Sequence, residues 1–531
     1  MSEMERIECP ERGVVMARRA MVAASHPLAV SAGLAMLQRG GNAVDAAVAA
    51  AAVLTVVEPF LSQVGGDNFM LIYSARTGEV RAINSSGAAP RAARIDAFPG
   101  RDSIPQLDPR AITVPGCVDG WHLALKFFGR MSLREVLEPA IDYAEHGAPV
   151  TYRISRKIEA SLGELSRFPE TVKRLTIDGR APRPGEVWKQ PDLARTLREI
   201  AIGGRDAFYR GEIARRIAAF VQELGGWLSA DDFAAHRSEI LDPISTTYRG
   251  FTVYEQPPVS QGCILLEELN ILEGFDIAAL SPADRIHVQV EAKKLAFADR
   301  SRWLADPRFF APPMRGLLSK EYAAERRRLI DMRRAAEPEP GDPLPYQSHT
   351  TYLCAVDAEG NCVSFIQSVF ANWGCGIIAG DTGVLLNNRM CGFSLDPHHP
   401  NRLEPGKRPV HTLNTYLVLD RGRPYIVGGT PGGDVQVQTN LQVLCNLIDL
   451  GMNPQEAVDA PRWSSGRGLA LSIENRVPAP VREELAARGH QVTVLGSWGQ
   501  SGRVQLIMID PAGGALLGGS DSRWDGYAVG W

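Results

Sequence analysis

Apolar positions follow two different patterns along this chain, and the change falls near residue 350. Before it helical spacing prevails: residues 27–38 have a helical pattern that stops at Gly40-Gly41, and an alanine-rich run follows Asn42. Ser281-Pro282 opens another helix, because serine caps a helix N-terminus and proline suits the first helical position. After residue 350, strand-like runs bounded by turn residues take over. The pattern predicts a mixed α and β protein.

Paired strands are predicted wherever two apolar runs flank a short turn. After residue 350 the pairs are 350–357 with 362–368, 415–419 with 424–427, and 504–509 with 516–517. Earlier in the chain one pair joins 69–73 to 80–84, whereas 115–275 is mostly helical with an apolar run at 240–253 that can hold a strand. A helix is predicted over 435–450, ended by Gly451.

The segment 334–345 separates the two patterns. It is acidic and holds four prolines, so it can form neither a helix nor a paired strand. It leads to Thr350, where a strand begins, and a loose segment ending at a hydroxyl residue is what a self-cleaving precursor needs. The new terminal α-amino group, with a pKa of roughly 7.7–8.0, can then serve as the base for its own hydroxyl. Taken alone, the segment favours an ordinary linker before a hairpin; the motifs farther along favour the precursor.

Composition narrows the function classes. The chain has 531 residues, 45% of them hydrophobic, and a net charge of −4 without the basic stripe of a nucleic-acid binder. Eight cysteines without a CxxC pair indicate reduced thiols. The apolar run 46–57 is shorter than the ~18 residues that suggest a membrane span. Residues 1–10 lack a signal-peptide pattern, so we expect a cytoplasmic protein with neither nucleic acid nor membrane as partner.

A series of short motifs, distributed over almost the whole chain, carries a further signal. In the first half the motifs are His26-Pro27-Leu28-Ala29, the segment 40–47 and Val114-Pro115-Gly116. In the second half they are the segments 350–361, 383–390 with Phe393-Ser394, 407–409, 430–434 and 459–463. In this order they resemble the γ-glutamyltransferase family of N-terminal-nucleophile hydrolases, and together they are far more specific than any one of them.

The resemblance implies an αββα four-layer sandwich formed by two chains from one precursor. Residues 1–349 would be the large subunit, ending in the cleavage linker 334–349, and residues 350–531 the small one. Cleavage would fall between His349 and Thr350, and the two subunits would stay together as a heterodimer that acts on a small-molecule amide.

Four residues are predicted to be catalytic. Thr350 is the nucleophile of both the self-cleavage and the later reaction, and the family places a hydroxyl at Ser368 to hydrogen-bond it. The glycine-rich run 428–434 lacks the lysine or following hydroxyl of a phosphate loop. Gly432 and Gly433 are therefore interpreted as backbone N–H donors to a tetrahedral oxyanion, and Asp434 as the N-cap of the next helix.

The predicted substrate pocket departs from the family pattern. γ-Glutamyl enzymes bind the substrate's α-amino and α-carboxylate groups with an arginine, an asparagine, an acid pair and a serine pair, and this chain has other residues at those positions. Together with Asn372, the predicted substrate-binding residues are Ser86, Phe370, Gly392 after Cys391, His411 and Thr412. Each lost charge-assisted hydrogen bond costs roughly 1.5–3 kcal/mol of binding. Several lost together should remove selectivity for γ-glutamyl compounds.

The sequence therefore predicts a self-processing amidohydrolase or acylase that uses an N-terminal threonine on a non-γ-glutamyl amide. The family members to compare cleave cephalosporin side chains or small amides such as oxamate. One alternative keeps γ-glutamyl hydrolysis or transfer with a changed set of substrate contacts, and another is an unprocessed, inactive scaffold. His398-His399 lacks helical spacing and nearby ligand-type residues, so a surface loop is favoured there and no metal or organic cofactor is predicted.

Overall fold

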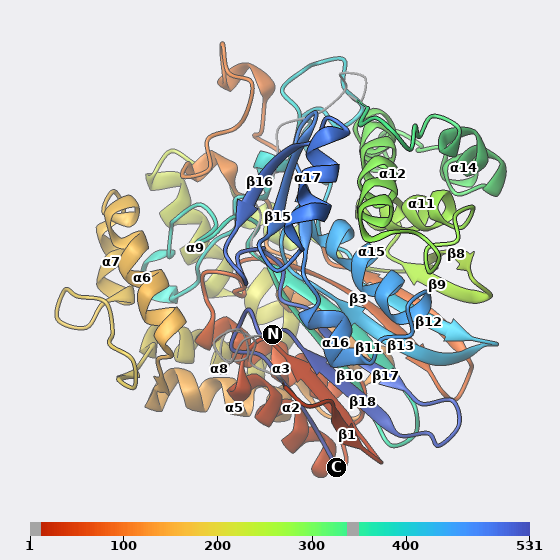
Figure 1. The fold of residues 1–531 in the computed structure, drawn as a ribbon. Coiled ribbons are helices and arrows are strands. Elements are labelled where there is room, and N and C mark those ends of the chain that lie inside the picture. Colours follow the sequence, from red (N-terminus) through yellow and green to blue (C-terminus); the bar gives the residue numbers. More distant parts are fainter. Residues whose placement is uncertain (1–11, 337–349) are drawn as a thin grey trace.

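Two seven-stranded antiparallel sheets lie face to face at the centre of the molecule (Figure 1). The computed structural model describes residues 12–336 and 350–531. Sheet I has the order β19-β2-β10-β11-β3-β4-β7, with strands β19 (Tyr527–Gly530), β2 (Met21–Ala24), β10 (Thr351–Val356), β11 (Cys362–Ser368), β3 (Asp67–Ser74), β4 (Glu79–Asn84) and β7 (Glu239–Leu241). Sheet II has the order β1-β18-β17-β13-β12-β9-β8, with strands β1 (Val15–Ala17), β18 (Leu516–Ser520), β17 (Gln505–Ile509), β13 (Arg423–Gly429), β12 (Tyr416–Asp420), β9 (Phe251–Glu255) and β8 (Ile244–Tyr248).

Alternating side chains of β10 show how the layers are held together. Tyr352 and Cys354 point into the apolar core between the sheets, where they meet side chains such as Leu417 and Ile507 of sheet II. Leu353 and Ala355 belong instead to the core beneath the helices. The sheets approach closely because a Cβ at Gly429 would lie 2.5 Å from the Tyr352 ring.

Helices cover the outer face of each sheet. Sheet I is covered by α2 (Pro27–Gln38), α3 (Ala43–Val57), α4 (Cys117–Phe128), α5 (Leu133–His146) and α8 (Pro191–Tyr209). Sheet II is covered by α11 (Gly262–Leu272), α12 (Pro282–Trp303) and α15 (Val435–Ile448). Every residue of α3 is buried, and its N-terminus is closed by a capping box between Asn42 and Asp45. The expected αββα sandwich is confirmed.

Smaller elements surround this sandwich. The helices are α6 (Tyr152–Leu165), α7 (Pro169–Leu175), α9 (Glu212–Glu223), α10 (Ala230–Ala235), α13 (Met314–Leu317), α14 (Lys320–Arg327), α16 (Pro454–Asp459) and α17 (Ala479–Ala487). The strands are β5 (Ala148–Pro149) and β6 (Val187–Trp188), and the three-stranded sheet of β14 (Trp463–Ser465), β15 (Ala470–Glu474) and β16 (Gln491–Leu495). Figure 1 shows α6 and α7 on the opposite side of the molecule from α11, α12 and α14.

The predicted hairpins and the helices at 27–38, 282–303 and 435–448 are present, but some details differ. The run 240–253 contributes to three strands rather than one, because two of its segments extend sheet II and one pairs with β4. Asp434 occupies the N-cap position of α15, which begins at Val435 as predicted, but its side chain makes no capping hydrogen bond. The seven cysteines within the described residues are free and buried, as expected. No helix in the described ranges has the length and apolarity needed to cross a membrane.

Candidate active site

Thr350 directly precedes β10, a central strand of sheet I. Because Thr351 pairs with Gln367 in the β10–β11 hairpin, the register places Thr350 beside Ser368. The Thr350 hydroxyl donates to Ser368 Oγ at 3.2 Å, and the backbone N–H of Phe370 donates to the same oxygen at 2.7 Å. All three residues are buried. The structure thus brings the predicted nucleophile and its predicted hydroxyl partner together, whereas His349 and the expected cleavage site lie outside the described residues.

The predicted oxyanion loop connects β13 to α15 and has a backbone that favours glycine. The φ angles of Gly432 and Gly433 are 133° and 60°. In the orientation of the Gln436 amide that satisfies its neighbours, its oxygen accepts the Gly433 N–H at 3.2 Å. The Gly433 N–H, predicted to meet an oxyanion, is therefore engaged by Gln436 in this structure.

A buried arginine holds this loop from α12. Arg300 Nη1 lies 2.6 Å from Asp434 Oδ1 and donates to Gln261 Oε1 at 2.7 Å. Gln261 Nε2 in turn donates to the carbonyls of Thr412 at 2.9 Å and Gly433 at 3.2 Å. The Asp434 carboxylate, predicted to cap α15, thus fixes the loop to a neighbouring helix.

A fully buried ion pair lies close to the hairpin. Asp67, the first residue of β3, accepts the Gly87 N–H on Oδ1 at 3.0 Å, and its Oδ2 lies 3.4 Å from Arg389 Nε. Burial raises the pKa of Asp67 to about 6 against the opposing effect of Arg389, and burial lowers the pKa of Arg389 to about 10. The Arg389 guanidinium is therefore charged at neutral pH, and its carbon lies 4.4 Å from the centre of the Phe370 ring.

His411 stands on the other side of the Asp67 carboxylate. Its Nε2 is 3.8 Å from Asp67 Oδ2, and its ring centre is 5.0 Å from that of Phe69. Burial, followed by the positive charges of Arg389 and Arg408, lowers the pKa of His411 well below its usual range. The imidazole is neutral near pH 7 and has one N–H to donate.

The structure gathers only part of the predicted substrate pocket. Phe370 and His411 surround the Asp67–Arg389 pair, and Gly392 packs against the residues before His411, since a Cβ on it would lie 2.9 Å from the Val410 carbonyl. Thr412 follows in the chain, and its carbonyl is held by Gln261.

The structure places two predicted substrate-binding residues, Ser86 and Asn372, and the nearby Trp373 in other surroundings. The buried Ser86 hydroxyl donates to Asn84 Oδ1 at 2.6 Å, so it is engaged within its own turn. Asn372 is half-buried, and its Oδ1 has no partner among the described residues. Trp373, three residues after Phe370, packs against Phe60 with ring centres 5.5 Å apart, in an apolar cluster separate from that of Phe370.

The sequence alone did not lead us to predict a role for Asp67 or Arg389. Arg389 lies in the motif 383–390, and Asp67 is the first residue of β3. The available signal was a charged residue within apolar surroundings: Arg389 lies between the segments 384–388 and 390–393. A charge in such a place is rarely buried unless it is paired or used.

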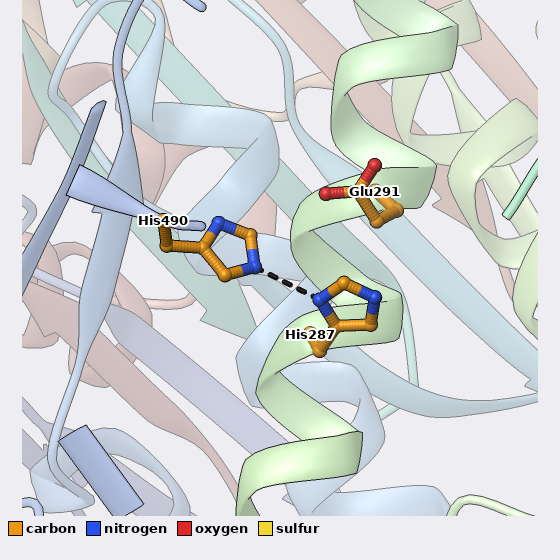
Figure 2. A group of neighbouring side chains, drawn as sticks. All are labelled: His287, Glu291 and His490. Atoms are coloured by element: carbon orange, nitrogen blue, oxygen red, sulfur yellow. Dashed lines mark hydrogen bonds between the residues drawn. The ribbon is translucent and has the colours of Figure 1, made fainter. Parts of the chain in front are cut away.

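Within the described residues, one group of potential metal ligands comes close together, and it is not His398-His399. His287, Glu291 and His490 face one another between α12 and the chain after α17 (Figure 2). The two imidazoles are joined by a 2.8 Å hydrogen bond between His287 Nδ1 and His490 Nε2. Lys294 Nζ lies 2.7 Å from Glu291 Oε1, so its ammonium already neutralises the carboxylate that a cation would need. We assign this cluster to packing.

Comparisons with known proteins agree with this architecture. The family model described as Gamma-glutamyltranspeptidase matches residues 29–531. The Glutathione hydrolase-like YwrD proenzyme of Bacillus subtilis (strain 168) is 42% identical over 525 residues, covering 97% of this chain and 99% of the relative. The Oxamate amidohydrolase proenzyme of Klebsiella pneumoniae is 37% identical, covering 96% and 98%. The crystal structure of a cephalosporin acylase from Bacillus halodurans superposes with a TM-score of 0.94 at 40% identity, covering 98% of this chain and 97% of that one. Because these matches run through both sheets and the β10–β11 hairpin, the chain belongs to the gamma-glutamyltranspeptidase family of N-terminal-nucleophile hydrolases.

Proposed function

We propose that this chain is a precursor that cleaves itself before Thr350 and then hydrolyses a small amide that is not a γ-glutamyl compound. The observation that carries the proposal is the 3.2 Å hydrogen bond between Thr350 Oγ1 and Ser368 Oγ at the start of a central, buried strand. A nucleophile held there by a sheet keeps its position after the bond before it is cut. The relatives named proenzymes support the same reading.

In the self-cleavage, the Thr350 hydroxyl attacks the carbonyl carbon of His349. The peptide C–N bond breaks as an ester C–O bond forms, and the nitrogen takes the proton and becomes the free α-amine of Thr350. Water then hydrolyses the ester, releasing the His349 carboxylate and restoring the hydroxyl. Ser368 holds the hydroxyl in place during the first step.

In the mature enzyme the same hydroxyl attacks the substrate amide. The α-amine of Thr350 accepts the hydroxyl proton and passes it to the leaving amine, so that an acyl ester remains on Thr350. Backbone N–H groups of Gly432 and Gly433 would stabilise the oxyanion of each tetrahedral intermediate. Water, deprotonated by the α-amine, then releases the acid.

The residues around Arg389 support a substrate without an α-ammonium. The position that would meet an ammonium is Gly392, which has no side chain, and the buried charges nearby are the Asp67–Arg389 pair. An ammonium desolvated there without a carboxylate of its own costs several kcal/mol. Relatives named an oxamate amidohydrolase and a cephalosporin acylase support an amide substrate other than a γ-glutamyl compound.

Processing is tested with two neighbouring threonines. Wild-type protein should run as two chains on a denaturing gel, and the smaller should begin Thr-Thr-Tyr-Leu on N-terminal sequencing. Thr350→Ala should remain one inactive chain. Thr351→Ala is the matched control. The Thr351 hydroxyl lies 2.8 Å from Ser25 Oγ and has no proposed part in the reaction, so this variant should still be cut. A different N-terminus, or cleavage of Thr350→Ala, would remove Thr350 from the mechanism.

A second candidate, hydrolysis or transfer of γ-glutamyl groups, is favoured by the name of the glutathione hydrolase-like relative. Comparing kcat/KM for γ-glutamyl and oxamate-type or glutaryl amides separates the two. A γ-glutamyl preference of tenfold or more, about 1.4 kcal/mol, would support the second candidate.

A further inference from the structure

The guanidinium of Arg389 is unusually poor in partners for a fully buried charge. Its side chain has 0% exposure, and the guanidinium's polar contact within the described residues is the Nε–Asp67 pair at 3.4 Å. Neither Nη1 nor Nη2 has a hydrogen-bond partner among the described residues. A guanidinium has five N–H donors in a planar fork, so four of them are left unused. Leaving charged donors unused in a buried place is costly, which points to a group that occupies them.

The surroundings of Arg389 indicate what that group is. Phe370 lies against the guanidinium, and the N–H groups of Nη1 and Nη2 at its outer edge are the donors still available for hydrogen bonds. Asp67 engages only the Nε side. His411, neutral and buried, likewise has neither ring nitrogen in a hydrogen bond within the described ranges, so it can add one donor. Two parallel N–H groups beside a further donor match the two oxygens of a carboxylate.

Contacts connect this arginine to the nucleophile. Its guanidinium lies on the ring of Phe370, the N–H of Phe370 donates to Ser368 Oγ, and Ser368 Oγ accepts from the Thr350 hydroxyl. A group bound by Arg389 is thus linked to the reacting hydroxyl through Phe370 and Ser368. This places it in the acyl half of an amide rather than at a distant surface.

The geometry points to Arg389 as the residue that binds a free carboxylate on the acyl group of the substrate, with His411 as an additional donor. The inference rests on the proposed amide hydrolysis and narrows its substrate class to monoamides of dicarboxylic acids, including oxamate-type compounds. Asp67 is a positioning residue, because it holds the Nε side of the guanidinium and leaves the Nη edge to the ligand. The alternative occupant of that edge is water.

Kinetics with matched substrates test the inference. The monoanilides of oxalic, succinic and glutaric acids are each compared with the neutral acyl anilide of the same length, in which a methyl group replaces the carboxylate. Wild-type protein should prefer at least one of the carboxylates, and Arg389→Met should lower that preference, the ratio of kcat/KM on the carboxylate to kcat/KM on its neutral match, by about 10- to 100-fold. Arg389→Lys, which keeps the charge and loses the fork, should recover only part of it. Arg402 is an exposed arginine later in the same segment, and Arg402→Gln should leave the preference for the carboxylate unchanged.

Removing Arg389 alone leaves the Asp67 carboxylate buried without its partner. The double variant Asp67→Asn with Arg389→Met removes both charges and is compared with the single variant. Appearance of the two chains on a gel shows that each variant folds and is processed. Equal losses on the carboxylate and neutral substrates would overturn the inference, as would a wild-type protein without preference for any carboxylate, which would leave water at the Nη edge.

A binding measurement separates this inference from the proposed function. Calorimetry with oxalate, succinate and glutarate needs no turnover: binding to wild type that weakens about 10-fold or more in Arg389→Met supports the carboxylate site even if no amide is hydrolysed. Amide hydrolysis without any carboxylate preference or binding would leave the proposed function intact and remove the role of Arg389.

Discussion

Gly433 matters at the scale of a single residue because its backbone, and not a side chain, is proposed to act. Its φ of 60° is one that a non-glycine residue rarely adopts, and its N–H lies at the start of α15 beside Gln436. We expect Gly433→Ala to keep the fold and to lose about 10²–10³ in kcat, because a displaced donor no longer meets the oxyanion.

Gly451 supplies the matched control for this variant. It lies just past the C-terminus of the same helix with a φ of 64° and nothing within 4 Å of an added Cβ. Gly451→Ala should cost about 1 kcal/mol of stability, as Gly433→Ala does, with kcat unchanged. Thermal melts and steady-state kinetics on both variants check this. Equal kcat for the two would move the oxyanion site elsewhere.

At the scale of elements, the His287–His490 hydrogen bond fastens α12 to the chain after α17. His287 Nε2 donates to the Asp331 carbonyl at 2.9 Å, so the proton shared at 2.8 Å comes from His490. The charged neighbours Lys294 and Arg488 face the pair. Burial, followed by the Lys294 charge, lowers the pKa of His490 to about 3. Its neutral form is therefore built into the folded state.

This pair predicts a loss of stability on mild acidification. In the unfolded chain histidine titrates near 6.5, so as the pH falls below that value the unfolded state gains protons that His490 does not accept when folded. Between pH 6.5 and 5 this should lower the free energy of unfolding by about 1–2 kcal/mol. Urea titrations on the uncleaved Thr350→Ala chain measure it. His490→Gln, which keeps an N–H donor, should remove this part of the pH dependence, while the exposed His398→Gln should not; an unchanged slope in His490→Gln would contradict the assignment.

At the scale of the whole molecule, the two expected subunits are interleaved. In sheet I, β10 and β11 of the second segment lie between β2 and β3 of the first, and β2 lies between β10 and β19. Sheet II likewise joins β1 to β18 and β9 to β12. Cutting before Thr350 would therefore leave every one of these strand pairs in place.

We accordingly expect the cleaved protein to remain one particle of about the precursor mass, 57.8 kDa. Size exclusion in high salt should show a single peak that contains both chains, because the interface is apolar core and strand pairing rather than surface charge. The Thr350→Ala precursor should elute at the same volume. Separation of the chains without denaturant would contradict the interleaved arrangement.

The sequence by itself determined the features that depend on neighbours along the chain. The hairpin from 350 to 368, the capped helix at 43–57 and the glycine turn before α15 follow from local spacing and turn chemistry, and the ordered motifs predicted Thr350 as nucleophile and Ser368 as its partner. The order of the strands and the choice of αββα layers came from the resemblance, since periodicity does not say which strands pair.

Only the tertiary structure decided how charges are paired across long separations. Arg389 pairs with Asp67, which lies 322 positions earlier in the chain. The Asp434 carboxylate pairs with Arg300 on another helix instead of capping its own. His287 shares a hydrogen bond with His490, 203 positions later. Each pairing exists because distant elements are packed in the same core, where burial forces every charge to find a partner or leave a donor open. Local sequence patterns do not specify that packing. The unpartnered Nη1 and Nη2 of Arg389 could therefore be recognised only in the folded molecule.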